Sequence, residues 1–339
     1  MSAYYRPLVQ QARPRPTDAA PLAGGTLWFT HAVRHSRDAA PQVVPLSEIP
    51  QDWMTRLTAA RAPLLGIPMD APCLMGILNV TPDSFSDGGR HKNTTAALLH
   101  AREMVQAGAA IIDVGGESTR PGSQTVPAEA EIARVEPVIT ALRHEAGVPI
   151  SIDTRKCSVA QAAVDAGARL VNDVSGFTHD PALARYCARH GLPVCVMHAQ
   201  GDPETMHLNP SYADVLLDIY DFLERQVAHL EGLGIPRARI LVDPGIGFGK
   251  TEAHNLTVLN GLSLFHGLGC AMLVGASRKG FIGRITGVKT AAERVHGSVA
   301  VALAAVAQGA QILRVHDVAE TAQALKLWQA IVEGQGNGT

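Results

Sequence analysis

One short pattern recurs three times along this chain, and it constrains the fold more than any other feature. In each case a helix-like segment ends at a glycine, a short strand with β-branched residues follows, and polar residues come next. The three segments are QAGAAIIDVGGES (106–118), DAGARLVNDVSG (165–176) and AQGAQILRVHD (307–317). Glycine often ends a helix because it adopts a left-handed backbone conformation without a steric penalty. The repetition predicts a fold that alternates helices and strands.

Five further runs have the composition of buried strands, which brings the expected number of strands to eight. They are LMGILNV (74–80), VPISIDT (148–154), LPVCVMH (192–198), ARILVDP (238–244) and CAMLVGAS (270–277). Helical patterns fill most of the intervals, and strands that are apolar on both faces are typical of parallel sheets covered by helices. The chain is therefore expected to form an α/β fold, a closed (β/α)8 TIM barrel. An open doubly wound sheet is the alternative.

The expected barrel domain occupies residues 71–335, and residues 1–70 form an N-terminal extension. The extension contains many proline and alanine residues and one strand-like patch, GTLWFTHAV. We expect a partly ordered cap or arm that is dispensable for chemistry, because every motif discussed below begins at or after Leu74. Within the barrel, the sequence Thr-Ala-Ala-Glu at 290–293 has the spacing of a capping box. It predicts the start of the helix that ends near Gln308.

The charge balance and the cysteines limit the classes of function. The chain has 29 basic and 31 acidic residues, a net charge of −2 and no long run of either sign. Nucleic acids and membrane surfaces need concentrated positive charge, so we expect neither as a partner. The five cysteines lack the spacing of a metal site and are expected to be reduced packing residues. Reduced cysteines favour a cytoplasmic location.

Two segments are tested for a membrane or export role, and neither fits. Residues 295–313 carry no charge, but they contain histidine and glutamine and divide at Gly309 into a helix and a strand. This composition argues against a membrane span. The N-terminus lacks the apolar segment of a secretory signal.

The segment ARILVDPGIGFGKT (238–251) has a glycine cluster followed by Lys-Thr, so it is tested as a nucleotide site. A P-loop requires its first glycine at the position that Pro244 occupies. A dinucleotide fingerprint requires a third glycine where Lys250 stands. We therefore interpret the segment as a strand that ends in Asp243 and a glycine-rich loop that carries one cation.

Polar residues follow every expected strand, at the end where (β/α)8 barrels carry their chemistry. In chain order they are Asn79, Asp113 with residues 117–122, Asp153, Asn172 with Asp173, His198, Asp243, residues 277–279, and Arg314 with His316. Two loops rich in glycine, serine and proline, residues 81–92 and 115–127, follow the first two strands. We expect these loops to take part in function.

The residues at the strand ends divide into two chemical groups. Arg120, Lys279, Arg314 and His316 can hold a polyanion, and arginine suits bidentate contact with phosphate. Asp153, Asn172 and Asp243 offer acceptors to a heterocycle rich in N–H donors. The combination predicts an enzyme pocket for a polar ring that carries phosphate.

Seven motifs resemble those of the dihydropteroate synthase family. In chain order they are MGILNVTPDSFSDGG, IIDVGGESTRPG, ISIDT, LVNDVSG, DPGIGFGK, GASRKGFIG and RVHDV, over about residues 75–317. The resemblance implies a transferase of folate biosynthesis. Such an enzyme joins p-aminobenzoate to 6-hydroxymethyl-7,8-dihydropterin pyrophosphate, releases pyrophosphate, uses Mg²⁺ and is usually a homodimer.

The resemblance also implies roles for individual residues. Asp153, Asn172, Asp243 and Lys279 would bind the pterin edge, and Arg314 would stack on the pterin face. Asn79 would bind Mg²⁺ and pyrophosphate, with help from Thr119, Arg120 and His316. Ser277 would help to bind the p-aminobenzoate carboxylate, and Phe85, Asp87 and Pro121 would lie on loops that complete this second pocket. The expected catalytic residues are Asn79, Arg120, Lys279 and His316.

Two other readings of the same pocket stay open at this point. A pterin-binding methyltransferase shares the barrel and the Asp/Asn grip on the pterin, but it does not need the ESTRPG loop or the lysine of SRKGF. A non-catalytic pterin-binding protein would be expected to lack Asn79, Arg120 or His316, and all three are present.

Overall fold

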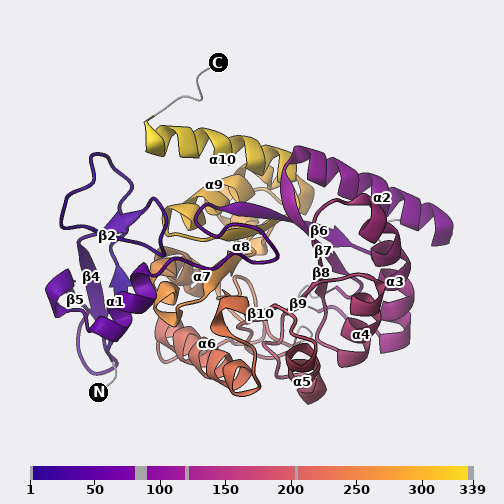
Figure 1. Ribbon diagram of the computed structural model, residues 1–339, viewed down its shortest axis with the longest axis horizontal. Helices are drawn as coiled ribbons and strands as arrows, with labels where there is room; N and C mark the ends of the chain where they lie inside the picture. Colours follow the sequence, from indigo (N-terminus) through magenta and orange to yellow (C-terminus); the bar gives the residue numbers. More distant parts are fainter. Residues whose placement is uncertain (1–2, 81–89, 119–121, 203–204, 335–339) are drawn as a thin grey trace.

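The chain folds into a closed barrel of eight parallel strands surrounded by helices (Figure 1). The computed structural model describes residues 3–80, 90–118, 122–202 and 205–334. The order of strands around the barrel is β10-β11-β12-β13-β6-β7-β8-β9, so each strand pairs with its neighbours in sequence and the last pairs with the first. The expected (β/α)8 barrel is confirmed, and the open doubly wound sheet is wrong.

The strands and helices of the barrel alternate as expected. The strands are β6 (Cys73–Asn79), β7 (Ala109–Gly115), β8 (Ile150–Asp153), β9 (Leu170–Asp173), β10 (Val194–Met197), β11 (Ile240–Asp243), β12 (Ala271–Val274) and β13 (Ile312–Val315). The α-helices are α2 (Arg90–Ala107), α3 (Ala128–Glu145), α4 (Cys157–Ala166), α5 (Pro181–Arg189), α6 (Val215–Gly232), α7 (Glu252–Asn260), α8 (Gly280–Thr286), α9 (Val295–Ala307) and α10 (Val318–Glu333). Short 3₁₀ helices are η3 (Arg237–Arg239), η4 (Leu262–Leu268) and η5 (Ala291–Glu293).

The three repeated segments have the predicted local structure. The glycines that follow α2, α4 and α9 adopt positive φ, +111° at Gly108, +134° at Gly167 and +92° at Gly309. The uncharged stretch 295–313 divides into α9 and β13. Among the described residues, no helix is long and apolar enough to span a membrane.

The capping box predicted at residues 290–293 is wrong. Thr290 precedes only the short η5, its side chain makes no capping hydrogen bond, and α9 begins at Val295. The side chain of Arg294 explains the interruption, because it donates to the backbone carbonyls of Arg278, Val288 and Lys289. These contacts hold the chain in a turn before α9 begins.

Two layers of inward-facing side chains fill the barrel, because alternate residues of a strand point to the same side. The layer near the strand starts is apolar and contains Met75, Ile111, Leu170, Cys195, Leu241, Ala271, Leu273 and Ile312. We call it the lower layer. Two residues further along four of these strands stand Asp113, Asn172, Asp243 and Arg314. We call this polar set the upper layer.

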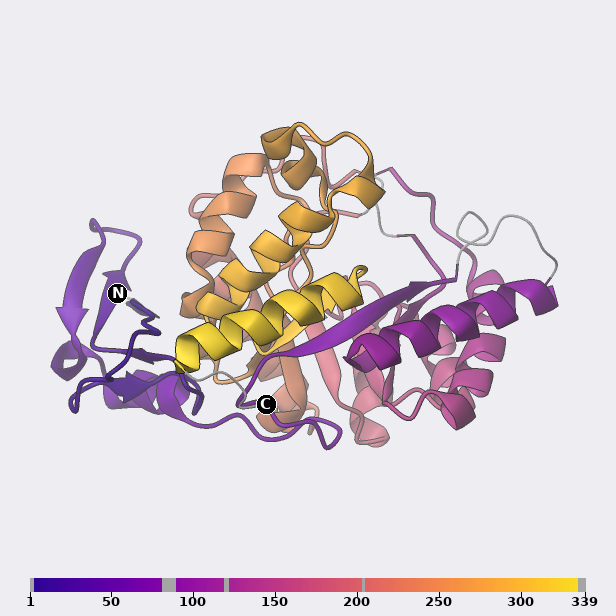
Figure 2. The same ribbon diagram turned by 90° about the horizontal axis from the view of Figure 1, so that it is seen from above.

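The N-terminal extension is folded. It contains β1 (Tyr4–Pro7), β2 (Ala20–Pro21), β3 (Trp28–Phe29), β4 (His31–His35), β5 (Gln42–Pro45), η1 (Leu46–Glu48) and α1 (Gln51–Thr58). Strands β1, β4 and β5 form a three-stranded antiparallel sheet. Figure 2 shows this part beside the start of β6, with β6 running away from it. The extension therefore lies toward the strand starts, away from the strand ends that carry the polar residues.

Specific contacts join the extension to α6 and η4. Trp53 stacks on Tyr220 of α6 with a centroid distance of 5.5 Å, and Arg37 forms ion pairs of 2.7 Å with Asp218 and with Asp221. A Cβ atom at Gly267 of η4 would lie 2.2 Å from the Trp53 ring, so only glycine allows this approach. The extension is thus packed against the barrel by matched surfaces.

The last ten residues of the extension close the barrel from below. Leu64 and Met69 are buried and pack in the lower layer. Arg61 is buried as well, and its guanidinium donates to the carbonyls of Cys270 (3.0 Å) and His266 (3.1 Å). We call residues 61–70 the plug.

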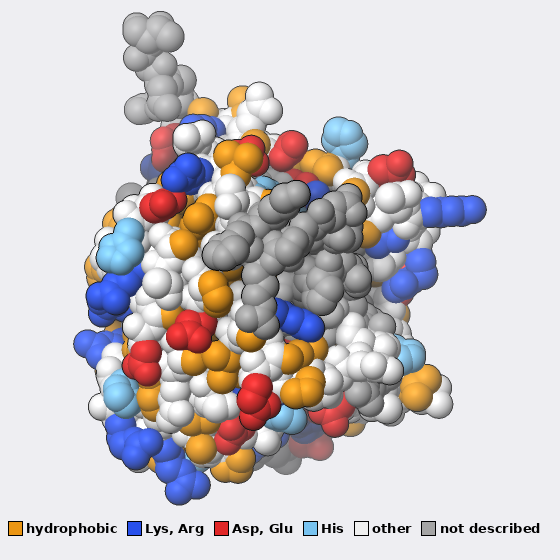
Figure 3. All heavy atoms as spheres, turned by 90° about the vertical axis from the view of Figure 1, so that its right-hand side faces the viewer, with side chains coloured by type: hydrophobic (Ala, Val, Ile, Leu, Met, Phe, Trp, Pro, Cys, Tyr) orange, Lys and Arg blue, Asp and Glu red, His pale blue; other side chains and the backbone are white. Residues whose placement is uncertain are grey.

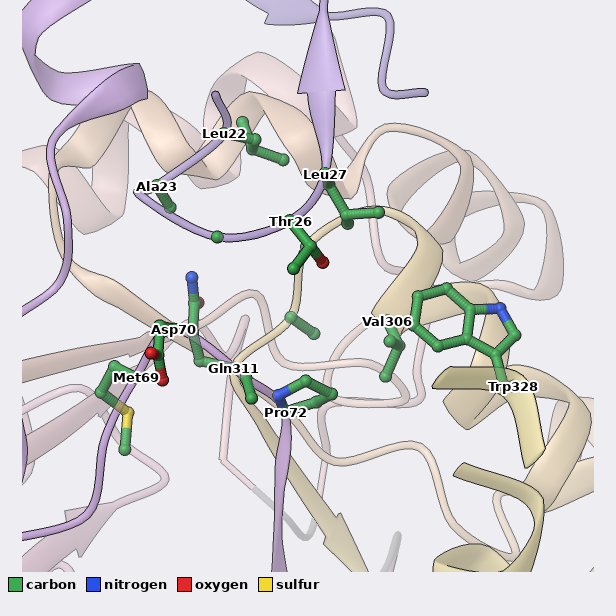
Figure 4. A pocket seen from close by; sticks show the side chains of 14 residues that line it. Leu22, Ala23, Thr26, Leu27, Met69, Asp70, Pro72, Val306, Gln311 and Trp328 are labelled. Carbon is green, nitrogen blue, oxygen red and sulfur yellow. The ribbon is translucent and has the colours of Figure 1, made fainter. Parts of the chain in front are cut away.

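A crevice lies at the same lower end, between the extension and the barrel (Figure 4). Its walls come from the turn at residues 22–27, the chain before β6, the loop before β13, and Trp328 of α10. The crevice is separate from the strand ends that carry the upper layer.

The surface carries no large region of a single charge on the face shown in Figure 3, where Lys/Arg and Asp/Glu side chains are interspersed. The five cysteines are free; Cys73 is half-buried and the other four are buried. The free cysteines agree with the expectation of reduced packing residues.

Candidate active site

Three polar residues, Asn79, Asp153 and Asn172, end neighbouring strands that the register of the sheet aligns. Asn79 pairs with Gly115, Gly115 with Asp153, and Asp153 with Asn172. Gly115 has no side chain, so Asn79 and Asp153 both face the space above it. A Cβ atom there would lie 3.7 Å from Asn79 Oδ1 and 3.7 Å from Asp153 Oδ2. The register therefore places a row of oxygen acceptors along one side of the barrel mouth.

Arg314 joins two of the buried carboxylates across the barrel. Its Nε donates to Asp113 Oδ2 at 2.6 Å and its terminal nitrogen to Asp153 Oδ2 at 2.7 Å. Asn172 Nδ2 donates to the same Asp113 oxygen at 3.2 Å. Asp153, Asn172 and Arg314, three of the residues predicted from sequence, are thus in one hydrogen-bonded cluster with Asp113.

This cluster contains two acidic side chains and one basic side chain. Two carboxylates share one guanidinium, and burial raises the pKa of Asp153 to about 7 in spite of Arg314. Burial disfavours the Arg314 cation, but the Asp113 and Asp153 carboxylates outweigh this effect and raise the Arg314 pKa. Asp113 Oδ1 is buried and has no hydrogen-bond partner among the described residues. An N–H donor of a ligand would satisfy such an oxygen.

Asp243 stands opposite, at the end of β11. Its Oδ1 accepts a hydrogen bond of 2.7 Å from the backbone N–H of Gly245. A Cβ atom at Gly275 would lie 3.7 Å both from Asp243 Oδ2 and from Arg314 Cβ, so these two side chains share the space above that glycine. Burial raises the pKa of Asp243 to about 6. Asp243 therefore offers a second buried acceptor to a ligand at the mouth.

Lys279, Ser277 and His316 complete the described part of the mouth. The Lys279 ammonium lies 4.0 Å above the centre of the Phe248 ring, a cation–π contact. Ser277 Oγ lies 3.0 Å from His316 Nδ1 and accepts from the His316 backbone N–H at 3.2 Å. The predicted neighbours Ser277 and His316 are therefore in direct contact.

Five predicted residues, Phe85, Asp87, Thr119, Arg120 and Pro121, lie outside the residues that the structure describes. The flanks of the second loop are described, and an ion network holds them. Glu117 accepts from Lys156 Nζ at 2.6 Å and from Arg155 at 3.2 Å, and Arg155 also donates to Thr125 Oγ1 at 3.1 Å. The two sides of the loop are thus fixed to the start of the segment that leads into α4.

The site also contains residues for which the sequence predicts no specific role. Asp113 is one, although a charged residue within an apolar strand was a visible signal. Lys250 is another: it is buried, and its amino group lies 2.9 Å from His198 Nδ1. Asp173 also lies at a polar strand end, but its two carboxylate oxygens accept from the backbone N–H groups of Ser175 and Phe177, so its role is structural.

A divalent cation at this mouth would need ligand atoms from a bound substrate in addition to those of the described residues. Among the described residues, no group of three or more His, Cys, Asp or Glu side chains could hold a metal ion. Mg²⁺ commonly keeps several waters and binds through one or two protein oxygens and the substrate phosphates. The amide oxygen of Asn79, beside Asp153 above Gly115, has the chemistry that such a shared site needs.

Comparison with known proteins identifies the family. The family described as pterin binding enzyme matches residues 75–316. The dihydropteroate synthase of Escherichia coli K12 is 46% identical over 266 residues, which are 78% of this chain and 94% of that protein.

Solved structures agree with the sequence comparison. A Yersinia pestis dihydropteroate synthase in complex with a sulfonamide drug has a TM-score of 0.75 and 44% identity, over 80% of this chain and 99% of that one. The Xanthomonas albilineans enzyme with 4-aminobenzoic acid has a TM-score of 0.74 and 45% identity, over 78% and 94% of the two chains. The barrel that carries these acceptors and cations is thus matched over nearly the full length of the relatives. The chain belongs to the pterin-binding enzymes and, among them, to the dihydropteroate synthases.

Proposed function

We propose that the chain condenses 6-hydroxymethyl-7,8-dihydropterin pyrophosphate with p-aminobenzoate to give 7,8-dihydropteroate and pyrophosphate. The observation that carries the proposal is the set of buried acceptors at the mouth, Asp153, Asn172 and Asp243, with the cations Arg314 and Lys279 beside them. A pterin ring is flat and rich in N–H donors, which such acceptors match. Structures of the Xanthomonas albilineans relative with 4-aminobenzoic acid and with 7,8-dihydropteroate support the same pair of chemical groups.

The pterin is proposed to bind across the upper layer. Asp153, Asn172 and Asp243 accept from its edge, Lys279 contacts the same edge, and Arg314 covers one face of the ring. Removing Asp243 leaves ring donors without partners in a closed pocket, which costs roughly 1–3 kcal/mol per donor. Asp243→Ala is therefore expected to weaken pterin binding in calorimetry. Unchanged affinity in a folded variant would remove Asp243 from the pterin site.

The pyrophosphate is proposed to lie near Asn79, Thr119, Arg120 and His316. Mg²⁺, with Asn79 as its protein ligand, would neutralise part of the charge of the leaving group. Asn79, Arg120, Lys279 and His316 are the proposed catalytic residues, because fixed donors and cations stabilise charge as it develops.

The reaction needs two bond changes at the pterin methylene group. The carbon–oxygen bond to pyrophosphate breaks first, and pyrophosphate leaves with the electron pair. The arylamine nitrogen of p-aminobenzoate then attacks the methylene cation and loses a proton to water. Ser277 would help to hold the p-aminobenzoate carboxylate, and Phe85, Asp87 and Pro121 would wall its pocket.

The direct test is to incubate the purified protein with the pterin pyrophosphate, p-aminobenzoate and Mg²⁺, and to detect dihydropteroate. Arg120→Ala should lower turnover by about 10²–10³, the usual cost of one preorganised electrostatic contact. Arg102→Ala is the matched control, because Arg102 is an exposed arginine on α2. Removing divalent metal with EDTA should also stop turnover, and full activity in EDTA contradicts the metal requirement.

The same assay separates the alternatives. A pterin-binding methyltransferase gives no dihydropteroate and transfers a methyl group, and a non-catalytic pterin-binding protein binds the pterin without turnover. Ser277, Lys279 and His316 are all present at the described mouth, which favours the synthase.

Homodimer formation and a cytoplasmic location are further proposals. Leu327 and Ile331 on α10 are 64% and 69% exposed, and large exposed apolar side chains often mark a protein interface. Light scattering of the wild type and of Leu327→Glu tests the dimer, and a monomeric wild type would contradict it. Free cysteines are typical of reducing compartments, and cell fractionation tests the location.

A further inference from the structure

We propose that Lys250 is a positioning residue of the pterin site: its buried amino group fixes the loop between β11 and α7, and this loop orients both Asp243 and Lys279. The inference deepens the proposed function, because the oriented groups are those assigned to the pterin.

The amino group of Lys250 faces the loop rather than the mouth. Its Nζ lies 2.8 Å from the carbonyl oxygen of Gly245, 3.1 Å from that of Phe248 and 3.4 Å from that of His198. It also lies 2.9 Å from His198 Nδ1. Burial and Lys250 lower the pKa of His198 to about 2, so this ring is neutral and Nδ1 can accept. Four acceptors thus surround this amino group. Burial lowers the Lys250 pKa to about 7, although the Asp243 carboxylate opposes this shift.

The loop between β11 and α7 needs a buried hydrogen-bond donor because its backbone packs closely against residues 198–200, which follow β10. A Cβ atom at Gly245 (φ +69°) would lie 1.9 Å from the His198 carbonyl oxygen, and one at Gly249 (φ +61°) would lie 2.4 Å from that of Gln200. The close approach turns backbone carbonyls inward, where an unpaired acceptor is costly. Lys250 satisfies several of them at a single point.

The first connection runs from Lys250 to Asp243. Lys250 holds the Gly245 carbonyl, and the Gly245 N–H donates to Asp243 Oδ1 at 2.7 Å. Lys250 also holds His198, whose backbone N–H donates to the Asp243 carbonyl at 3.0 Å. A displaced loop would therefore rotate the carboxylate that is proposed to grip the pterin.

The second connection runs from Lys250 to Lys279. Lys250 holds the carbonyl of Phe248, and the Phe248 ring lies 4.0 Å below the Lys279 ammonium. A Cβ atom at the neighbouring Gly247 would lie 3.0 Å from Lys279 Cδ, so the loop also supports the Lys279 stem. The Lys250 amino group thus orients both the Asp243 carboxylate and the Lys279 side chain, which line the same side of the pocket.

Other residues keep the loop folded if Lys250 is changed, so the inference can be tested. Asn255 Oδ1 accepts from the Gly247 N–H at 2.6 Å, and Tyr212 donates to the Gly249 carbonyl at 2.7 Å. Thr251 and His254 form a capping box at the start of α7. In a Lys250 variant the loop should therefore keep its overall backbone path, while the carbonyl groups that Lys250 contacts shift in position.

The test is calorimetry of the full chain with 6-hydroxymethyl-7,8-dihydropterin, together with thermal unfolding. Lys250→Met keeps the length of the side chain and removes its donors, and we expect pterin affinity to fall roughly tenfold or more. Lys250→Gln keeps part of the donor capacity and should lose less, and it serves if Lys250→Met does not fold.

Two controls separate positioning from general loss of stability. Leu142→Ala removes a buried side chain at the far end of α3, so it should lower the unfolding temperature and leave pterin affinity unchanged. Lys326→Met on α10 should change neither quantity. Pterin affinity within twofold of wild type in a folded Lys250→Met overturns the inference. Failure of the wild type to bind the pterin overturns the proposed function instead.

Discussion

The two layers inside the barrel are built on the same strands and have opposite chemistry. Ile111, Leu170, Leu241 and Ile312 belong to the lower layer, and Asp113, Asn172, Asp243 and Arg314 stand two residues further along the same four strands. The lower layer is closed by the plug residues Leu64 and Met69. The upper layer opens to the mouth and keeps a buried carboxylate oxygen, Asp113 Oδ1, without a partner among the described residues.

The difference shows that side chains two residues apart on one strand can serve stability in one layer and ligand binding in the next. Apolar side chains in the lower layer gain free energy by leaving water. Buried carboxylates in the upper layer cost free energy unless a partner compensates them, and a ligand that supplies donors recovers part of this cost. Changes in the lower layer should therefore alter stability alone, while changes in the upper layer should alter binding as well as stability.

The largest expected effect comes from removing the extension. A chain that begins at Ala71 lacks Leu64 and Met69, and each large-to-small change in a core typically costs about 2–5 kcal/mol. We expect a large loss of stability in urea unfolding and unchanged turnover per folded molecule, because the proposed site residues that the structure describes lie at the other end of the barrel. A chain that begins at Ala60 keeps the plug and should lose less. Lost turnover in a well-folded barrel would mean that the extension acts on the site.

A smaller but still severe effect is expected for Arg314→Met in the upper layer. The variant leaves Asp113 and Asp153 buried without their shared cation, and breaking a buried ion pair in this way costs about 3–5 kcal/mol. Pterin binding should be lost at the same time.

The matched control for Arg314→Met is the triple variant that adds Asp113→Asn and Asp153→Asn. Removing both carboxylates should restore stability in urea unfolding, because no buried charge is then left uncompensated. Pterin binding should stay absent. Recovery of binding together with stability would show that the upper layer is a structural cluster rather than a ligand site.

The sequence predicted the barrel and most of its polar mouth for a physical reason. Strand pairing in a (β/α)8 barrel follows chain order, so Asn79, Asp153 and Asn172 could be placed together once their strands were recognised. The direction of the Lys250 side chain was beyond the sequence, because it depends on how closely residues 244–250 approach the chain after β10.

The packing of the extension was also beyond the sequence. Arg61 donates to carbonyls of Cys270 and His266, about two hundred residues away along the chain. No local pattern encodes such a contact, because the acceptors are backbone groups that every residue carries. The same limit explains the wrong capping box at 290–293, where the side chain of Arg294 and its distant partners override a favourable local sequence.

The smallest expected effect is a pH dependence of the free energy of unfolding, which the upper layer contributes and the lower layer does not. Burial raises the pKa of Asp243 to about 6 from an ordinary value of 3.8, so the folded protein binds this proton more tightly than the unfolded chain does. Between about pH 4 and pH 6, ionisation of Asp243 therefore costs stability as the pH rises. The contribution is roughly 1.4 kcal/mol per pH unit, on the order of 3 kcal/mol across the window. Histidines such as His198 act in the opposite direction, because burial lowers the His198 pKa to about 2, so the wild type alone does not isolate Asp243.

Comparing wild type with Asp243→Asn cancels the contribution of the histidines. An asparagine oxygen can still accept from Gly245, but the side chain does not ionise. The free energy of unfolding of Asp243→Asn, relative to wild type, should therefore increase as the pH rises from 4 to 6. Leu241→Ala, on the same strand in the lower layer, should lower the free energy of unfolding by the same amount at both pH values. If the two variants show the same dependence on pH in urea unfolding, Asp243 does not carry a buried charge and the contrast between the layers is one of shape alone.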